Sequence, residues 1–159
     1  MAETESFIDA VGGAGIEEQF EAIPLSVPQK SQTSMTPLVL VLEDDALQLE
    51  LLIDHLHSLG IVAVSVMTIA GAREQLNQHK FDLAILDIQL PDGSGLELCE
   101  SMADDARYCS LPTIVLSSMS QNNMVRRSRA AGARFFISKP YDPNVLLTVI
   151  ERALGITLQ

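Results

Sequence analysis

A regular alternation of short apolar runs and amphipathic segments constrains the fold of this chain more than any other feature. The first run, LVLVL at residues 38–42, is apolar at every position. A strand that is apolar on both faces is typical of a parallel sheet covered by helices on both sides. The sequence therefore predicts an α/β fold, with strands at residues 38–42, 61–66, 83–86, 113–117 and 134–138.

The amphipathic segments carry signals for where helices begin and end. Gly60 stands where a glycine commonly ends a helix. Thr68 is suited to cap the start of the second helix, and Asp142 followed by Pro143 is suited to start the last one. We expect a loop at residues 87–95 and helices at about residues 46–59, 69–79, 96–102, 121–131 and 143–155.

Five strand–helix units predict a doubly wound, five-stranded parallel sheet with five helices. For five strands the flavodoxin-like order 2-1-3-4-5 is favoured, and its ligand crevice lies at the carboxyl ends of strands 1 and 3. Functional side chains should therefore directly follow the apolar runs.

Residues 1–36 differ in composition from the rest of the chain. They contain six acidic residues and one basic residue, Lys30, with several glycines and prolines. We predict a flexible acidic tail there and one domain at residues 37–159. The rival interpretation is an arm that folds on a partner or on the domain. No further domain is expected after Gln159, so the protein should act through partners.

Charge and composition exclude some classes of function. The net charge of −11 is unfavourable for direct nucleic-acid binding, which needs a cationic face. Cys99 and Cys109 are too few for a disulfide framework. A basic leader followed by an apolar stretch, or an apolar run of membrane-spanning length, is not found in the sequence. We therefore expect a cytoplasmic protein without membrane or direct nucleic-acid contacts.

Reactive side chains follow four of the apolar runs. Glu43 and Asp44 come after the first run, Asp87 after the third, Ser117 ends the fourth, and Lys139 follows the fifth. Since the carboxyl ends of parallel strands share one edge of the sheet, these groups should meet there.

The acids at this edge predict a metal site. Two carboxylates 4 Å apart repel by roughly 4 kcal/mol at an effective dielectric constant of about 20. Glu43, Asp44 and Asp45 alone could simply favour a helix N-terminus. With Asp87 on the adjacent strand, a cation among the carboxylates is the better interpretation, and hard oxygen ligands suit Mg²⁺.

The same edge predicts phosphoryl chemistry. A carboxylate is ionised at neutral pH, so Asp87 can attack a phosphoryl group without a general base. The metal and the ammonium of Lys139 would neutralise charge on the transferring oxygens, and the Ser117 hydroxyl could donate to one of them.

Four segments resemble the signature blocks of response-regulator receiver domains, of the CheY-like superfamily: VLVLEDD, ILDIQLPDGSG, PTIVLSS and GARFFISKP. The intervals between Asp44, Asp87, Ser117 and Lys139 agree with that family, and the resemblance covers residues 37–157. It implies a single-domain switch in a two-component system or phosphorelay. A histidine kinase or a histidine phosphotransfer protein would be the phosphoryl donor. Such a protein promotes its own phosphotransfer and dephosphorylation but is not a turnover enzyme.

The resemblance also implies roles for individual residues. Asp87 would be the phospho-acceptor and Lys139 the invariant lysine of the family, and the peptide bond from Lys139 to Pro140 would be cis. Ser117 and Phe136 would be the switch residues, changing partner binding on the face formed by residues 121–131, 134–138 and 143–155. The implied Mg²⁺ ligands are Glu43, Asp44 (the more direct of the acidic pair), Asp87 and the backbone carbonyl of Gln89.

Three departures from the family pattern affect these expectations. Ser117 replaces the commoner threonine but keeps the hydroxyl, and Ser118 replaces a usual alanine. Met119 stands where some relatives have a polar residue that positions the hydrolytic water. We therefore expect slow loss of the phosphoryl group.

Three other functions compete with this interpretation. A phosphorylation-independent interaction module on the same fold usually lacks the acceptor, an acid or the lysine, and this chain has all of them. A haloacid dehalogenase-type phosphatase needs a second acid at position 89, which is Gln89 here. A flavin-binding flavodoxin is disfavoured by the absence of Trp and the presence of only two Tyr.

A cluster of basic residues remains outside these motifs. Arg126, Arg127, Arg129 and Arg134 are four of only ten basic residues. They form either an ordinary solvated helix face or a docking site for an acidic partner surface. The acidic tail at residues 1–36 is one candidate, acting as an intramolecular cover.

Overall fold

The computed structural model describes residues 36–119 and 122–158, all within one compact unit, Thr36–Gln159. Apart from Thr36, the segment for which we expect a tail lies outside the described residues, so that expectation stays a prediction. Within the described residues, no helix is both long and apolar enough to cross a membrane.

Strands and helices alternate along the described chain as the sequence predicts. The five main strands are β1 (Leu38–Leu42), β2 (Val62–Val66), β3 (Leu83–Asp87), β6 (Thr113–Ser117) and β7 (Phe135–Ser138). The helices are α2 (Ala46–Ser58), α3 (Ile69–Gln78), α4 (Gly95–Ala103), α5 (Asn122–Ala130) and α6 (Pro143–Leu154).

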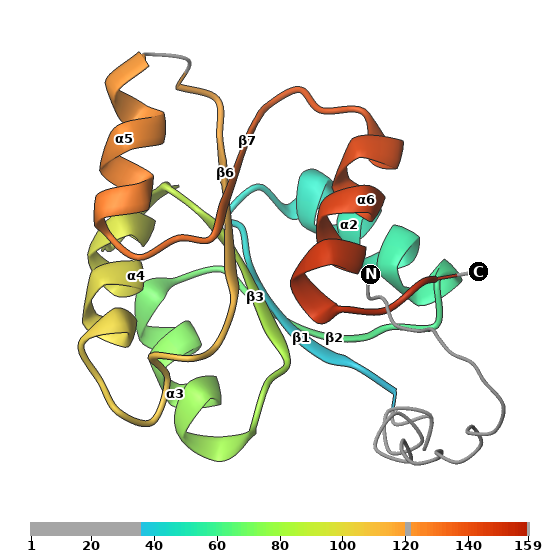
Figure 1. Cartoon of the computed structure of the whole chain (residues 1–159), viewed down its shortest axis with the longest axis horizontal. Coiled ribbons are helices and arrows are strands. Elements are labelled where there is room, and N and C mark those ends of the chain that lie inside the picture. Colours follow the sequence, from blue (N-terminus) through green and yellow to red (C-terminus); the bar gives the residue numbers. More distant parts are fainter. Residues whose placement is uncertain (1–35, 120–121, 159) are drawn as a thin grey trace, which may run out of the picture. The chain divides into compact units, whose positions relative to one another are not determined.

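The five strands form one parallel sheet in the order β2-β1-β3-β6-β7. Numbered along the chain, this is the predicted order 2-1-3-4-5, so the flavodoxin-like fold is confirmed. Helices α3, α4 and α5 cover one face of the sheet, and α2 and α6 cover the other (Figure 1). The order reverses direction between β1 and β3, which places the expected crevice at their carboxyl ends.

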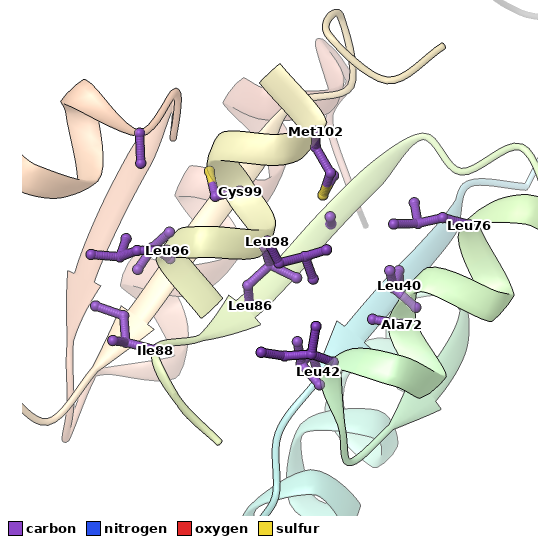
Figure 2. Packing of buried hydrophobic residues seen from close by; sticks show 14 of the residues in the cluster. Leu40, Leu42, Ala72, Leu76, Leu86, Ile88, Leu96, Leu98, Cys99 and Met102 are labelled. Carbon is purple, nitrogen blue, oxygen red and sulfur yellow. The ribbon is translucent and has the colours of Figure 1, made fainter. Parts of the chain in front are cut away.

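Each central strand contributes to two separate cores. Leu40 and Leu42 of β1 point into the core beneath α3, α4 and α5, where Leu42 lies near Leu86 of β3 (Figure 2). Val39 and Val41, the alternate residues, belong to the core on the α2 and α6 side. This division explains why the run is apolar at every position: successive side chains of a strand point to opposite faces, and here both faces are buried.

The predicted helix ends are confirmed. The Thr68 hydroxyl accepts a hydrogen bond from the amide of Gly71 at 3.0 Å and caps α3. Asp142 caps α6 in the same way, with Pro143 in the first helical position. Gly155 ends α6 in the left-handed region, at φ 69°, where a side chain would be strained.

The segment expected to be a loop is more ordered than the sequence indicates. Asp87 is the last residue of β3, and the next residues form a two-stranded antiparallel hairpin, β4 (Gln89–Leu90) and β5 (Gly93–Ser94). The expectation of a loop at residues 87–95 was therefore wrong. Strands of two residues are too short to show a hydrophobic period, so the pattern could not reveal them.

Gly95, the first residue of α4, packs directly on the backbone of β3. A Cβ atom at this position would lie 1.9 Å from the carbonyl oxygen of Asp87. We expect Gly95→Ala to lower the free energy of unfolding by about 3 kcal/mol, because β3 or α4 must move. Urea denaturation would measure the loss. Gly155→Ala is the matched control, since nothing lies within 4 Å of its added Cβ and only the positive φ is unfavourable; an equal loss in both variants would contradict this account.

Candidate functional site

Three carboxylates meet at the carboxyl ends of β1 and β3. Glu43 and Asp44 directly follow β1, Asp87 ends β3, and one oxygen from each lies within 4.8 Å of the others. Glu43 and Asp87 are buried, whereas Asp44 is exposed. The structure thus brings together the three acids that the sequence singled out, at the edge where the topology places a ligand crevice.

Lys139 supplies a positive charge to this group of acids. It follows β7, and its Nζ lies 2.5 Å from Oε1 of Glu43 and 3.5 Å from Oδ2 of Asp87. The peptide bond from Lys139 to Pro140 is cis, as the resemblance implies. The ammonium therefore contacts two of the three carboxylates and makes its shorter contact with Glu43.

The surroundings of the buried Asp87 raise the pKa of its side chain. Burial raises the pKa of Asp87, and the negative charge of Glu43 raises it further. Lys139 and the amide of Ile88 act in the opposite direction, and the resulting pKa is about 6. The carboxyl is thus mostly ionised at neutral pH, but only by a margin of about one pH unit.

The charge of Lys139 is secured by the same contacts. Burial lowers its pKa, but the hydrogen bond to Glu43 and the charge of Asp87 outweigh that effect, so the pKa is raised overall. The side chain stays an ammonium across the physiological range, as charge neutralisation at the site requires.

Backbone amides orient the carboxylates. The amide of Ile88 donates to Oδ1 of Asp87 at 2.8 Å, and the amide of Asp45 donates to Oε2 of Glu43 at 3.1 Å. The Asp45 side chain instead accepts from the amide of Gln48 and caps α2. The interpretation that an acid here serves a helix N-terminus thus applies to Asp45, whereas Glu43 and Asp44 face the site.

Ser117 and its neighbours complete the edge of the site. The buried Ser117 hydroxyl accepts a hydrogen bond from the amide of Met119 at 2.9 Å. The amide of Lys139 donates to the Ser117 carbonyl at 2.7 Å. Because of this bond, the end of β6, which carries the hydroxyl, and the residue after β7, which carries the ammonium, are fixed to each other.

Phe136 and Phe135 lie on opposite faces of β7, as alternation along a strand requires. Phe136 is half-buried and packs against the core beneath α3, α4 and α5, while Phe135 packs on the other side. Of the two rings, only Phe136 therefore lies on the side of the sheet that α5 covers.

Sequence reasoning overlooked two residues after Asp87, one in the turn of the β4–β5 hairpin and one at the start of α4. Asp92 accepts hydrogen bonds from the amides of Ile69 and Ala70, at the start of α3. Gly95 allows α4 to begin directly against the Asp87 carbonyl. The segment PDGSG signals a turn, but nothing in it identifies the helix that the turn contacts.

The donor set fits a small, hard divalent cation. Three carboxylates, with the backbone carbonyl of Gln89 nearby in sequence, offer oxygen atoms only. Their mutual repulsion is only partly offset by one ammonium, so a divalent cation would stabilise the arrangement. The exposed Asp44 leaves one side of the group open to solvent, which suits an ion that keeps part of its water shell.

Comparisons with known proteins show which family the chain resembles. A family model described as the response regulator receiver domain matches residues 39–151. The polar-differentiation response regulator DivK of Brucella ovis is 30% identical over 121 residues, which cover 76% of this chain and 98% of that protein.

Solved structures show the same likeness. The signal receiver domain of a signal transduction histidine kinase from Syntrophus aciditrophicus has 30% identity and a TM-score of 0.71, over 76% of this chain and 91% of that one. A CheY-like receiver domain protein from Methanospirillum hungatei has 26% identity and a TM-score of 0.71, over 76% and 95%.

The raised pKa of Asp87 makes a titration prediction. In metal-free protein we expect the Asp87 side-chain carboxyl to titrate at about pH 6, measured by carbon NMR. Mg²⁺ should move the midpoint lower, because a cation binds the ionised form and competes with the proton. In Glu43→Gln the midpoint should also fall, because one source of repulsion is removed; a metal-free midpoint near 4 in wild type would contradict the electrostatic account.

Proposed function

This chain belongs to the response regulator receiver domain family of two-component signalling, and we propose that Asp87 is the residue that accepts the phosphoryl group, in a Mg²⁺-dependent reaction. The observation that supports this most is the group of Glu43, Asp44 and Asp87, with ligand atoms within 4.8 Å of one another and Lys139 in contact with two of them. The reaction would transfer phosphoryl from a phosphohistidine and leave an aspartyl phosphate.

In the proposed transfer, an ionised oxygen of Asp87 attacks phosphorus, a P–O bond forms and the P–N bond to the donor histidine breaks. The leaving imidazole nitrogen keeps the electron pair and takes up a proton from solvent. Lys139, 3.5 Å from the Asp87 oxygen, would neutralise charge on the transferred group. Asp87 needs no general base, because its pKa of about 6 leaves it mostly ionised at neutral pH.

Asp44, Asp87 and the backbone carbonyl of Gln89 are the proposed Mg²⁺ ligands, with Glu43 beside them. Bound Mg²⁺ would supply positive charge to the phosphoryl oxygens. The contact between Glu43 and Lys139 supports this division of roles, because it leaves the exposed Asp44 as the more accessible ligand of the pair.

The proposed readout begins at Ser117. Its hydroxyl now accepts from the amide of Met119, and it would turn to donate to a phosphoryl oxygen on Asp87. Phe136, half-buried on the α5 side of β7, would move into the space vacated. The face formed by α5, β7 and α6 would then present a changed surface to a downstream protein.

The donor and its docking site belong to the same proposal. A groove of about 670 Å³ runs between α2 and the start of α6 and reaches Ser118 and Lys139 at the site. Leu47 and Leu51 on α2 are 65% and 61% exposed, and Leu51 lines the groove. An apolar groove next to the acceptor suits a helix of a histidine kinase or a histidine phosphotransfer protein. With such a donor, the proposed location of this chain is the cytoplasm.

The output surface carries a charge of its own. Arg126, Arg127, Arg129 and Arg134 are exposed, and Val125 beside them is 41% exposed. A surface that is partly apolar and cationic suits an acidic protein partner better than it suits a nucleic acid, because the chain as a whole is strongly acidic.

The proposal is tested by phosphorylation in the absence of any kinase. Incubation with acetyl phosphate and Mg²⁺ should add the mass of one phosphoryl group to the wild-type chain, and peptide mapping should place it on Asp87. Asp87→Asn and metal chelation should abolish the addition, and Lys139→Ala should slow it at least tenfold, or about 1.4 kcal/mol. Lys80→Ala is the matched control, since Lys80 is exposed and lies before β3 at the opposite edge of the sheet. Normal phosphorylation of Asp87→Asn would contradict the assignment of the acceptor, and a wild-type chain that gains no phosphoryl group would favour a phosphorylation-independent module.

The phosphoryl group should be lost slowly. Met119 is half-buried and packs against the core beneath α3, α4 and α5, so its side chain offers no hydrogen bond to a water that attacks phosphorus. We expect a half-life of minutes or longer at neutral pH, measured by intact mass after removal of acetyl phosphate. Met119→Gln should shorten it, and decay of the wild-type protein within seconds would rule the prediction out.

A further inference from the structure

The turn of the β4–β5 hairpin is attached to the start of α3 by one side chain. Oδ1 of Asp92 accepts from the amide of Ile69 at 2.9 Å, and Oδ2 accepts from the amide of Ala70 at 3.1 Å. Thr68 takes the next amide, that of Gly71. The first turn of a helix leaves its backbone amides without partners within the helix. Three of these amides in α3 have side-chain acceptors, and for two of them the acceptor is Asp92, which lies in a distant segment. The same bonds lower the pKa of Asp92, so the carboxylate stays charged.

The other end of the hairpin is attached to β3. The amide of Gly95 donates to the carbonyl of Ile88 at 2.8 Å, and Gly95 approaches the Asp87 carbonyl too closely for any side chain. Gln89 lies between these two attachments and pairs with Ser94 across the hairpin. The backbone of Gln89 is thus fixed on two sides: the base of the hairpin is bonded next to β3, and the turn of the hairpin is bonded to α3.

The start of α3 is in turn connected to the acids that follow β1. The amide of Glu43 donates to the carbonyl of Val66, the last residue of β2, at 3.1 Å, and α3 begins three residues later. Asp92 is therefore connected to Glu43 by two hydrogen bonds to backbone groups, at Ile69 and at Val66, and by the short stretch of backbone between these two residues. Through this connection, the segment that carries Gln89 is fixed relative to the segment that carries Glu43 and Asp44.

We propose that Asp92 is a positioning residue, which holds the β4–β5 hairpin so that the Gln89 carbonyl is correctly placed for a divalent cation among Glu43, Asp44 and Asp87. This inference rests on the proposed function, since it takes the Gln89 carbonyl to be a ligand. Asp92 itself lies in the turn between β4 and β5 and contacts α3. It acts on the site only through the backbone.

Substitutions at Asp92 separate this role from a general effect of charge. Asp92→Ala removes both hydrogen bonds to α3, whereas Asp92→Asn removes the charge but keeps one acceptor oxygen. Asp82→Ala is the matched control: Asp82 is also exposed, and its carboxylate also accepts from a backbone amide, that of Leu38, at 2.8 Å. That amide begins β1, at the opposite edge of the sheet.

Mg²⁺ binding by the full chain, measured by calorimetry, is the first readout. We expect Asp92→Ala to weaken binding about tenfold, Asp92→Asn to weaken it less, and Asp82→Ala to change it less than twofold. The measurement is repeated at about 1 M salt, where the Debye length is about 3 Å and the loss of a remote charge is screened. A wild-type affinity in Asp92→Ala, or an effect that disappears at high salt, overturns the proposal.

The Mg²⁺ dependence of acetyl phosphate labelling is the second readout. In Asp92→Ala the half-saturating Mg²⁺ concentration should rise about tenfold while the rate at saturating Mg²⁺ stays close to wild type, which general destabilisation would not produce. If Asp92→Ala and wild type have the same half-saturating Mg²⁺ concentration, the positioning role is overturned.

The two proposals fail in different ways. If wild type neither binds Mg²⁺ nor becomes labelled on Asp87, the proposed function is overturned, and this inference with it. If wild type is labelled and Asp92→Ala behaves like wild type, only this inference is overturned.

Discussion

The repulsion among Glu43, Asp44 and Asp87 is the constraint on which the rest of the structure depends. Burial and the charge of Glu43 together raise the pKa of Asp87 to about 6, and the contact with Lys139 only partly offsets them. Such a group of charges is stable only if the surrounding fold holds it in place or a cation enters. Reactivity toward a phosphoryl group and affinity for a divalent cation therefore have the same physical origin.

The parallel sheet holds this group of charges in place. Leu42 pairs with Leu86 in register, so the residues that directly follow β1 lie beside Asp87 at the end of β3. Both faces of these strands are buried, under α3, α4 and α5 on one side and under α2 and α6 on the other (Figure 1). A close-packed core does not deform continuously, so it can keep like charges together.

Helix α5, which belongs to the proposed output face, contributes a polar side chain to its buried contact with the sheet. Of the α5 side chains whose burial the structure describes, Met124 and Ser128 are buried, as is Ala131 in the turn that follows; the Ser128 hydroxyl has no hydrogen-bond partner among the described residues. A buried hydroxyl without a hydrogen-bond partner lowers stability, because the group has lost its bonds to water. This cost destabilises the packing of α5 on the sheet, which favours α5 as the helix that shifts after a small change at Ser117.

The sequence alone determined the parallel sheet, its strand order and the acids at its edge, because these follow from local patterns: apolar runs, helix caps and the residues after each strand. It did not determine the β4–β5 hairpin, the contact of Asp92 with α3, or that Lys139 lies closer to Glu43 than to Asp87. Lys139 and Glu43 are 96 residues apart, and no local periodicity encodes their distance. The tertiary structure decided these contacts, because strand register and crossovers set which groups from distant segments meet.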